Sequence, residues 1–104
     1  MKSAVLTDQR EVTVSDRERP SPGDDDVIVE IGACGVCMTD YHLYHGTFPA
    51  EFPVVPGHES AGEVVATGDG VSNFEEGDRV AVFPGIPCGE CDFCKEGKQN
   101  LCEN

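Results

Sequence analysis

The sequence predicts a mostly β fold, an irregular barrel to which a loop-rich lobe is attached. Two observations lead to this prediction. Short runs of β-branched and other apolar residues recur as far as residue 83, and clusters of turn residues separate them. From about residue 85 to residue 104 this pattern is replaced by a loop composition with four cysteines. A chain of 104 residues suffices for one domain with one small core.

The first elements are strands. The runs "SAVLTD" (3–8) and "EVTVSD" (11–16) are rich in β-branched residues and predict a hairpin. The segment "RPSPGDDD" (19–26) is a turn of Pro, Gly and Asp. It leads into "DVIVEIGAC" (26–34), a predicted strand that is apolar on both faces except at Glu30.

The middle of the chain contains one short helix and a loop. The segment "CMTDYHLYHG" (37–46) predicts a helix that Gly46 ends. The following "FPAEFPVVPG" (48–57) holds three prolines, which exclude helix and central strand. We therefore expect an extended loop that delivers His58 to its place.

The last strands follow this loop. The segment "HESAGEVVATG" (58–68) predicts a strand with small residues on one side, and "DGVSNFEEGD" (69–78) predicts a long turn. A further strand is predicted at "RVAVF" (79–83). From "PGIPCGE" (84–90) onward we expect only loop, held together by the cysteines.

The charge of the chain excludes some partners. It carries 20 acidic and 7 basic residues, a net charge of −13. Nucleic acids and anionic membrane surfaces require Lys and Arg, so neither is an expected partner. The acid is dispersed and lysine is scarce. This composition fits either a protein of a salt-loving, halophilic host or an ordinary acidic cytosolic protein.

The expected location is the cytoplasm. No apolar run approaches the ~18 residues of a membrane span, and the amino terminus "MKSAVLTDQR" lacks the pattern of a signal peptide. In such a compartment six cysteines indicate metal binding or redox chemistry rather than disulfides.

The strongest motif is "CGECDFCKEGKQNLC". Its cysteines follow the spacing C-x2-C-x2-C-x7-C and are Cys88, Cys91, Cys94 and Cys102. Four thiolates can enclose one Zn²⁺ in a closed tetrahedron, which stabilises a loop and leaves no position for substrate. Lys95 and Lys98 are expected to offset the negative charge of such a site. An iron–sulfur cluster or two disulfides are the alternatives.

A second candidate set is Cys37, His58 and Glu59. These three residue types form an incomplete set for a catalytic zinc, which needs three protein ligands and an open position. Taken singly, His58 and Cys37 are more easily explained as structural residues. Cys34 and Cys37 also form a C-x-x-C pair that could be a redox motif. The residues alone favour neither the catalytic metal site nor the redox pair.

Four segments of the chain resemble the zinc-containing medium-chain alcohol dehydrogenases in order and spacing. They are "GACGVCMTDYHLYHG", "FPVVPGHESAGEVV", "GDGVSNFEEGDRVAV" and "CGECDFCKEGKQNLC". The resemblance covers almost the entire chain. It implies a GroES-like barrel over residues 1–104, with a zinc-binding lobe at about 85–104, and it implies oxidation of a small-molecule alcohol with NAD or NADP.

The resemblance also implies roles for the metal-site residues. Cys37 and His58 look like ligands of the catalytic zinc, and Glu59 resembles an adjacent carboxylate that can exchange onto the metal. Asp40 is similar to the acid that orients the histidine ligand. The four cysteines of the 88–102 segment look like the structural zinc site.

Two more residues resemble the family's proton relay. Thr39 looks like the hydroxyl that takes the substrate's proton, and His42 like the outer end of the relay. Met38 differs from many members of the family, which carry a basic residue there, so a phosphate contact is not expected at that position.

No G-x-G-x-x-G motif follows a predicted strand, so we expect no dinucleotide to bind within these 104 residues. The ending at "LCEN" predicts an amino-terminal fragment that lacks the Rossmann domain. Such a fragment would be inactive alone, and we expect the full-length enzyme to be a homo-oligomer. The alternative is a standalone structural zinc-binding module without catalysis.

Overall fold

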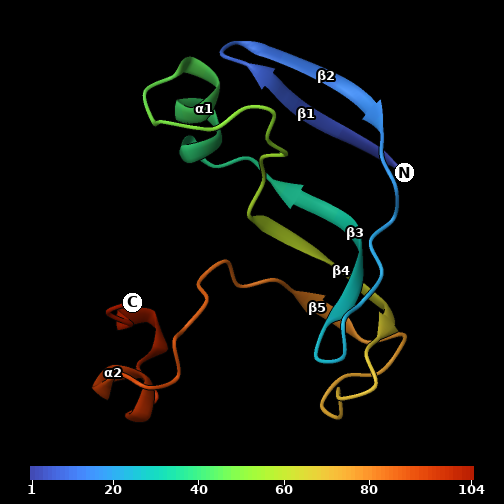
Figure 1. The fold of residues 1–104 in the computed structure, drawn as a ribbon, viewed down its shortest axis with the longest axis vertical. Coiled ribbons are helices and arrows are strands. Elements are labelled where there is room, and N and C mark those ends of the chain that lie inside the picture. The colour runs from blue at the N-terminus through green and yellow to red at the C-terminus, as the bar shows by residue number, and fades with distance from the viewer.

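The computed structural model describes residues 1–104, and its strands form two antiparallel sheets (Figure 1). The first sheet is the hairpin of β1 (Lys2–Asp8) and β2 (Glu11–Asp16). The second sheet has the order β3-β4-β5, formed by β3 (Val27–Gly35), β4 (Glu59–Thr67) and β5 (Arg79–Ala81). The helical elements are α1 (Met38–His45), α2 (Asp92–Lys95) and the 3₁₀ turn η1 (Gln99–Leu101). The predicted mostly β class is therefore confirmed.

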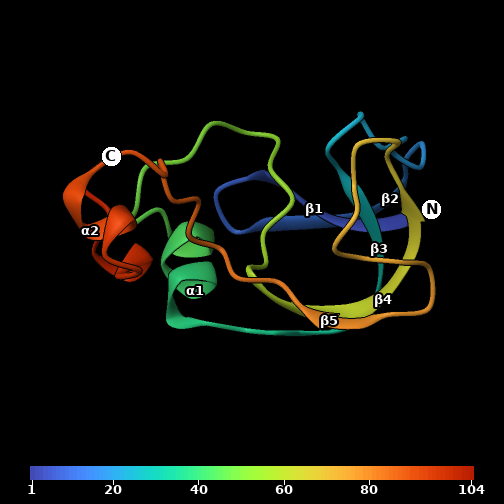
Figure 2. The same cartoon turned by 90° about the horizontal axis from the view of Figure 1, so that it is seen from below.

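A single bridge joins the hairpin to the loop that precedes β4. The amide of Leu6 donates to the carbonyl of Val54 at 2.8 Å, and the amide of Val54 donates back to Leu6 at 3.0 Å. Leu6 therefore satisfies its backbone groups through the proline-rich segment 48–57. That segment runs between α1 and β4, as predicted (Figure 2). His58 follows it directly and precedes Glu59, the first residue of β4.

The core is smaller than the length of the chain allows. Only Val5 and Leu6 on β1 and Val64 on β4 are buried. The accessible surface is 7801 Å², whereas a compact protein of this mass would expose about 5,700 Å². Large apolar side chains consequently remain exposed on both sheets and in the lobe, among them Val14 on β2, Ile31 on β3 and Ile86 in the lobe.

Two sequence predictions need correction. The strand predicted at 79–83 ends at Ala81, although the amide of Val82 still donates to Ser60 at 2.8 Å. The strand predicted at 26–34 is present as β3, Val27–Gly35, and Ile31 on it is half exposed. The lobe is not all loop, since it contains α2 and η1. The two-residue spacing of its cysteines brings the amide of Cys94 onto the sulfur of Cys91, which starts one helical turn.

Helix α1 begins and ends where the sequence indicated. Cys37 is its N-cap residue, with extended backbone angles. Gly46 ends it with a φ of 75°, a left-handed conformation that glycine adopts without steric cost. None of the helices is long and apolar enough to cross a membrane.

Candidate metal centres

The first candidate centre lies where three segments meet. Cys37 caps α1, His58 ends the proline-rich loop, and Glu59 begins β4. One ligand atom from each residue lies within 4.8 Å of the other two. A thiolate, an imidazole and a carboxylate at this separation are a donor set that suits Zn²⁺. The structure thus brings together the three residues that the sequence singled out.

The absence of a side chain at Gly35 leaves space for the Glu59 carboxylate. The two residues are partners in the β3–β4 ladder. A Cβ atom on Gly35 would collide with Oε2 of Glu59 and would lie 3.2 Å from its Cβ. Only a residue without a side chain lets the carboxylate lie across the end of β3. This cradle fits a site that uses the carboxylate.

Cys37 and His58 favour each other's charged forms. Hydrogen bonds from the backbone and side chain of Thr39 lower the pKa of the Cys37 thiol, and His58 adds to this shift. Contact with Cys37 raises the pKa of the His58 imidazole, and the negative carboxylate of Asp40 acts in the same direction. The pair therefore presents a thiolate readily, which is the form that binds a metal.

Asp40 lies within ion-pair distance of His58 but makes no hydrogen bond to it, and its expected role in orienting this imidazole stays a prediction. Its Oδ1 lies 3.8 Å from His58 Nδ1, which is too far for a hydrogen bond. Its two oxygens instead accept backbone N–H groups, Oδ2 from Cys37 at 2.9 Å and Oδ1 from Gly57 at 3.1 Å. The link from Asp40 to Gly57 was not foreseen, because the two residues are far apart in sequence and nothing in either segment indicates the other.

Thr39 and His42 lie three residues apart on α1, so they share one face of the helix. The Thr39 Oγ1 atom lies 3.7 Å from the sulfur of Cys37. The His42 ring packs against Phe48, with ring centroids 5.0 Å apart. Its Nδ1 atom is buried and has no hydrogen-bond partner. Both predicted relay residues therefore lie on α1, the helix whose N-cap is the proposed metal ligand Cys37.

The second candidate centre is the four-cysteine cluster. The sulfurs of Cys88, Cys91, Cys94 and Cys102 all lie within 4.8 Å of one another, and all four cysteines are free. The Cys88 and Cys94 sulfurs are 3.9 Å apart. A tetrahedron with metal–sulfur bonds of ~2.3 Å has an edge of about 3.8 Å. The separation thus fits four thiolates on one ion, and it is too long for a disulfide.

Amide groups, and not lysines, face these sulfurs. The backbone amides of Glu90 and Cys91 donate to the Cys88 sulfur at 3.4 and 3.3 Å, and the Asn104 side chain donates at 3.4 Å. Lys98 instead pairs with Glu96 at 2.8 Å, and the expected effect of Lys95 and Lys98 on the charge of the site stays a prediction. Asn104 was missed, and its position two residues after the last cysteine was the only available signal.

The thiols of the four-cysteine cluster differ in pKa. The Asn104 side chain and nearby backbone amides lower the pKa of Cys88 to about 6. A hydrogen bond from the backbone of Glu103 lowers the pKa of Cys91. Partial desolvation of the Cys94 thiol raises its pKa to about 12. A metal ion that binds all four sulfurs must therefore displace a proton from Cys94, so binding should weaken as the pH falls.

Cys34 is not part of either centre. Its thiol is exposed and donates to the carbonyl of Gly35 at 3.6 Å. It does not belong to the converging set of Cys37, His58 and Glu59. The arrangement therefore favours a metal site over a C-x-x-C redox pair.

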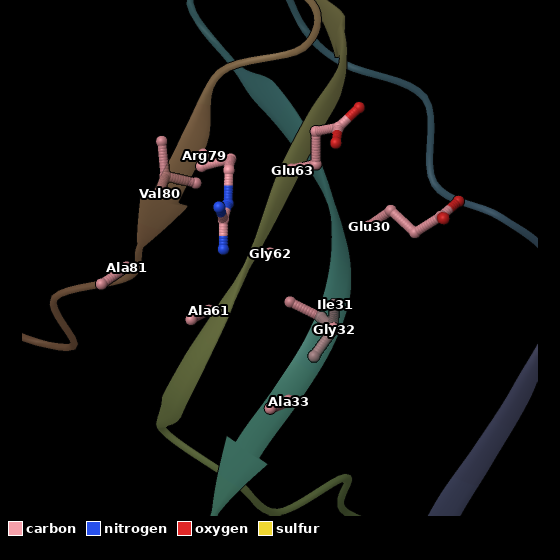
Figure 3. Close-up of a pocket in the computed structure, with 10 residues that line it drawn as sticks. All are labelled: Glu30, Ile31, Gly32, Ala33, Ala61, Gly62, Glu63, Arg79, Val80 and Ala81. Atoms are coloured by element: carbon pink, nitrogen blue, oxygen red, sulfur yellow. The ribbon is translucent and has the colours of Figure 1, made fainter.

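The open hollow of about 710 Å³ in Figure 3 lies elsewhere, on the three-stranded sheet. Its lining includes the small residues Gly32, Ala61 and Gly62 and the charged residues Arg79 and Glu63, and the Arg79 side chain extends between β5 and β4. None of the predicted site residues lines it. The metal-binding chemistry is therefore separate from this hollow.

Comparison with known proteins shows the family to which the chain belongs. Residues 23–104 match the family described as "Alcohol dehydrogenase GroES-like domain". Sorbitol dehydrogenase of Bacillus subtilis is 43% identical over 98% of this chain and 30% of its own length. An alcohol dehydrogenase of Geobacillus stearothermophilus is 42% identical over 98% of this chain and 31% of its own length. The chain thus spans about 30% of the length of these relatives.

A solved structure shows the same fold. An alcohol dehydrogenase from Escherichia coli CFT073, complexed with the cofactor NADH, superimposes with a TM-score of 0.85 at 38% identity. The match covers 98% of this chain and 30% of that one.

Proposed function

The chain belongs to the alcohol dehydrogenase GroES-like domain family, and we propose that it is the zinc-binding amino-terminal part of a dehydrogenase that oxidises an alcohol to an aldehyde or ketone with NAD or NADP. The relatives support this proposal, since they include a sorbitol dehydrogenase and an alcohol dehydrogenase, and one solved relative holds NADH. The single observation that carries it is the convergence of the Cys37, His58 and Glu59 ligand atoms within 4.8 Å.

Two zinc ions have suitable donors. Cys37 and His58 would hold the catalytic ion, with the Glu59 carboxylate beside them in the cradle of Gly35. When bound there, Zn²⁺ would act as a Lewis acid that makes the hydroxyl of an alcohol easier to deprotonate. The four cysteines of the lobe would hold a structural ion, because four sulfurs leave no position for substrate.

The residues of α1 would move the proton. Thr39 lies beside the Cys37 sulfur, so its hydroxyl can accept the proton of an alcohol bound at this site. His42 is next on the same helix face and would pass the proton on. Its buried Nδ1 atom without a partner supports this role, because buried polar atoms are normally hydrogen-bonded. A hydroxyl of a bound substrate or cofactor could complete that bond.

Hydride transfer requires a nicotinamide held close to the reacting carbon. Within the proposal, the remaining part of a full-length enzyme would hold it, as the length of the relatives suggests. This chain would contribute the metal ligands and the proton relay.

The test compares variants of the full-length protein that contains this chain. We expect His58→Ala to lose the catalytic zinc and its activity. Thr39→Val should keep its zinc and lower the rate of hydride transfer by about 10²- to 10⁴-fold, because valine preserves the shape and removes the hydroxyl. Cys34→Ser is the matched control, since it alters a cysteine outside both centres.

The readouts are zinc content and the single-turnover rate of nicotinamide reduction. Full activity in His58→Ala would remove the catalytic-zinc assignment. Full activity in Thr39→Val would remove the relay while leaving the metal site in place.

A further inference from the structure

We propose that Asp40 is a positioning residue that fastens the two ligand-bearing segments together through their backbone amides, so that Cys37 and His58 are in place before a metal binds. The inference rests on the proposed function for its significance, since it concerns the same centre. It differs from the role expected from the sequence, in which Asp40 acts on the imidazole of His58.

The contacts of Asp40 lead to this inference. Its Oδ2 atom accepts the amide of Cys37 itself, at 2.9 Å. Its Oδ1 atom accepts the amide of Gly57, the residue before His58, at 3.1 Å. The imidazole of His58 lies farther away, with 3.8 Å between Nδ1 and Oδ1. Each carboxylate oxygen is therefore engaged by the backbone of one ligand segment.

A simple helix cap does not explain both contacts. Asp40 is the third residue of α1, and a carboxylate there commonly accepts the amide of the N-cap residue. The bond to Gly57 lies outside that motif, because Gly57 is 17 residues away and belongs to the proline-rich segment. This second bond contributes nothing to capping the helix. Its effect is to join the helix start to the loop that carries His58.

The backbone of Gly57 is shaped for this contact. Its φ is 106°, a conformation that side chains rarely adopt, and a Cβ atom there would lie 3.0 Å from the sulfur of Cys34. A glycine at this position therefore lets the chain turn and direct its amide toward Asp40. The Asp40 side chain is only 13% exposed, so water has limited access to its two oxygens, and the bond to Cys37 is the more shielded because Gly57 is itself exposed.

The expected benefit is preorganisation. Hydrogen bonds to an ionised carboxylate are stronger than those between neutral groups. Two of them on one side chain would lower the entropy that the ligand segments lose when a metal joins them. Without Asp40, the two segments would have to be ordered by the metal itself. We therefore expect metal affinity to fall by about 10- to 100-fold when the carboxylate is removed.

The test measures amide hydrogen exchange in the full-length protein, as purified and after chelation. In Asp40→Ala, exchange at Cys37 and Gly57 should become at least about tenfold faster, since both amides lose a charged acceptor. In Asp40→Asn, only one of the two amides should be affected, because a carboxamide has one acceptor oxygen. The amides of Val64 and Gly70, bonded to backbone carbonyls elsewhere, report whether the domain remains folded.

Two further variants separate the competing explanations. Asp78→Asn is the matched control, since Asp78 accepts the amide of Glu75 at 3.0 Å, outside both metal centres. It should leave exchange at Cys37 and Gly57 unchanged. His58→Ala should also leave both amides protected after chelation, because the contacts do not pass through the imidazole.

Unchanged exchange at Cys37 and Gly57 in Asp40→Ala would overturn the inference, as would equal loss of protection in His58→Ala. These readouts need no alcohol oxidation. If the protein proved not to be a dehydrogenase, the exchange data would still decide whether Asp40 holds the two segments together.

Discussion

Replacing one cysteine of the lobe should disorder the lobe and leave the sheets intact. The variant is Cys91→Ser. Cys91 is the N-cap of α2, and its side chain accepts the amide of Cys94. Serine is a preferred N-cap residue and can accept the same bond. The substitution therefore removes a metal ligand without removing the cap, so any loss of order reports the metal.

The magnitude follows from what orders residues 88–102. No residue of α2 or η1 is buried, so apolar packing contributes little. Ordering these fifteen backbone units costs about 15–30 kcal/mol. Each backbone hydrogen bond within the lobe contributes about 1 kcal/mol. There are six, donated by the amides of Lys95, Glu96, Gly97, Lys98, Leu101 and Cys102.

The shortfall is therefore about 9–24 kcal/mol, a range that includes the 10–16 kcal/mol that a structural zinc typically supplies. Amide exchange across 88–102 should rise to near unprotected rates in Cys91→Ser and in the chelated wild-type protein. Exchange in β3 and β4 should not change, and Cys34→Ser should behave like the wild type. Unaltered protection of the lobe in Cys91→Ser would refute the reasoning, because the lobe would then be ordered without its metal.

Two further predictions concern the first centre. Gly35→Ala should displace the Glu59 carboxylate and weaken zinc binding at the first centre by about tenfold. Gly32→Ala is the control, because a Cβ atom there would meet only a carbonyl oxygen at 3.8 Å. Zinc competition titrations measure the affinity of both variants, and equal affinities would contradict the role of Gly35. In the metal-free protein the Cys37 thiol should titrate below its ordinary pKa, by ultraviolet absorbance of the thiolate. The ionised Cys37 thiol stabilises the fold above the pKa that it has in the unfolded chain, and this stabilisation is lost as the pH falls through its lower pKa in the folded protein. His58→Ala should raise the midpoint of the Cys37 titration. An unchanged midpoint would exclude the pairing of Cys37 with His58.

Much of the local structure was predictable from the sequence because it depends on neighbouring residues. Apolar and β-branched residues indicated the hairpin and the strands at 26–34 and 58–68, which the structure places at 27–35 and 59–67. Gly46 marked the end of α1, since a left-handed residue stops a helix there. The C-x2-C-x2-C-x7-C spacing brought four sulfurs into one cluster because short gaps constrain where thiolates can lie. The family resemblance in the same segments is confirmed by the match over residues 23–104.

The tertiary structure decided what depends on residues far apart in sequence. Which backbone groups Asp40 would accept could not be read from its own helix, because Gly57 reaches it only through the path of the proline-rich loop. The room that Gly35 leaves for Glu59 depends on the register of β3 against β4.

Burial was equally undetermined by sequence. An apolar strand pattern shows which faces of the strand avoid water, but it does not show whether another segment of the chain covers them. Ile31 on β3 remains half exposed, while Val64 on the neighbouring strand β4 is fully buried. Local propensity is set by short-range sterics and spacing, whereas burial and hydrogen-bond partners arise only when distant segments are brought together in space.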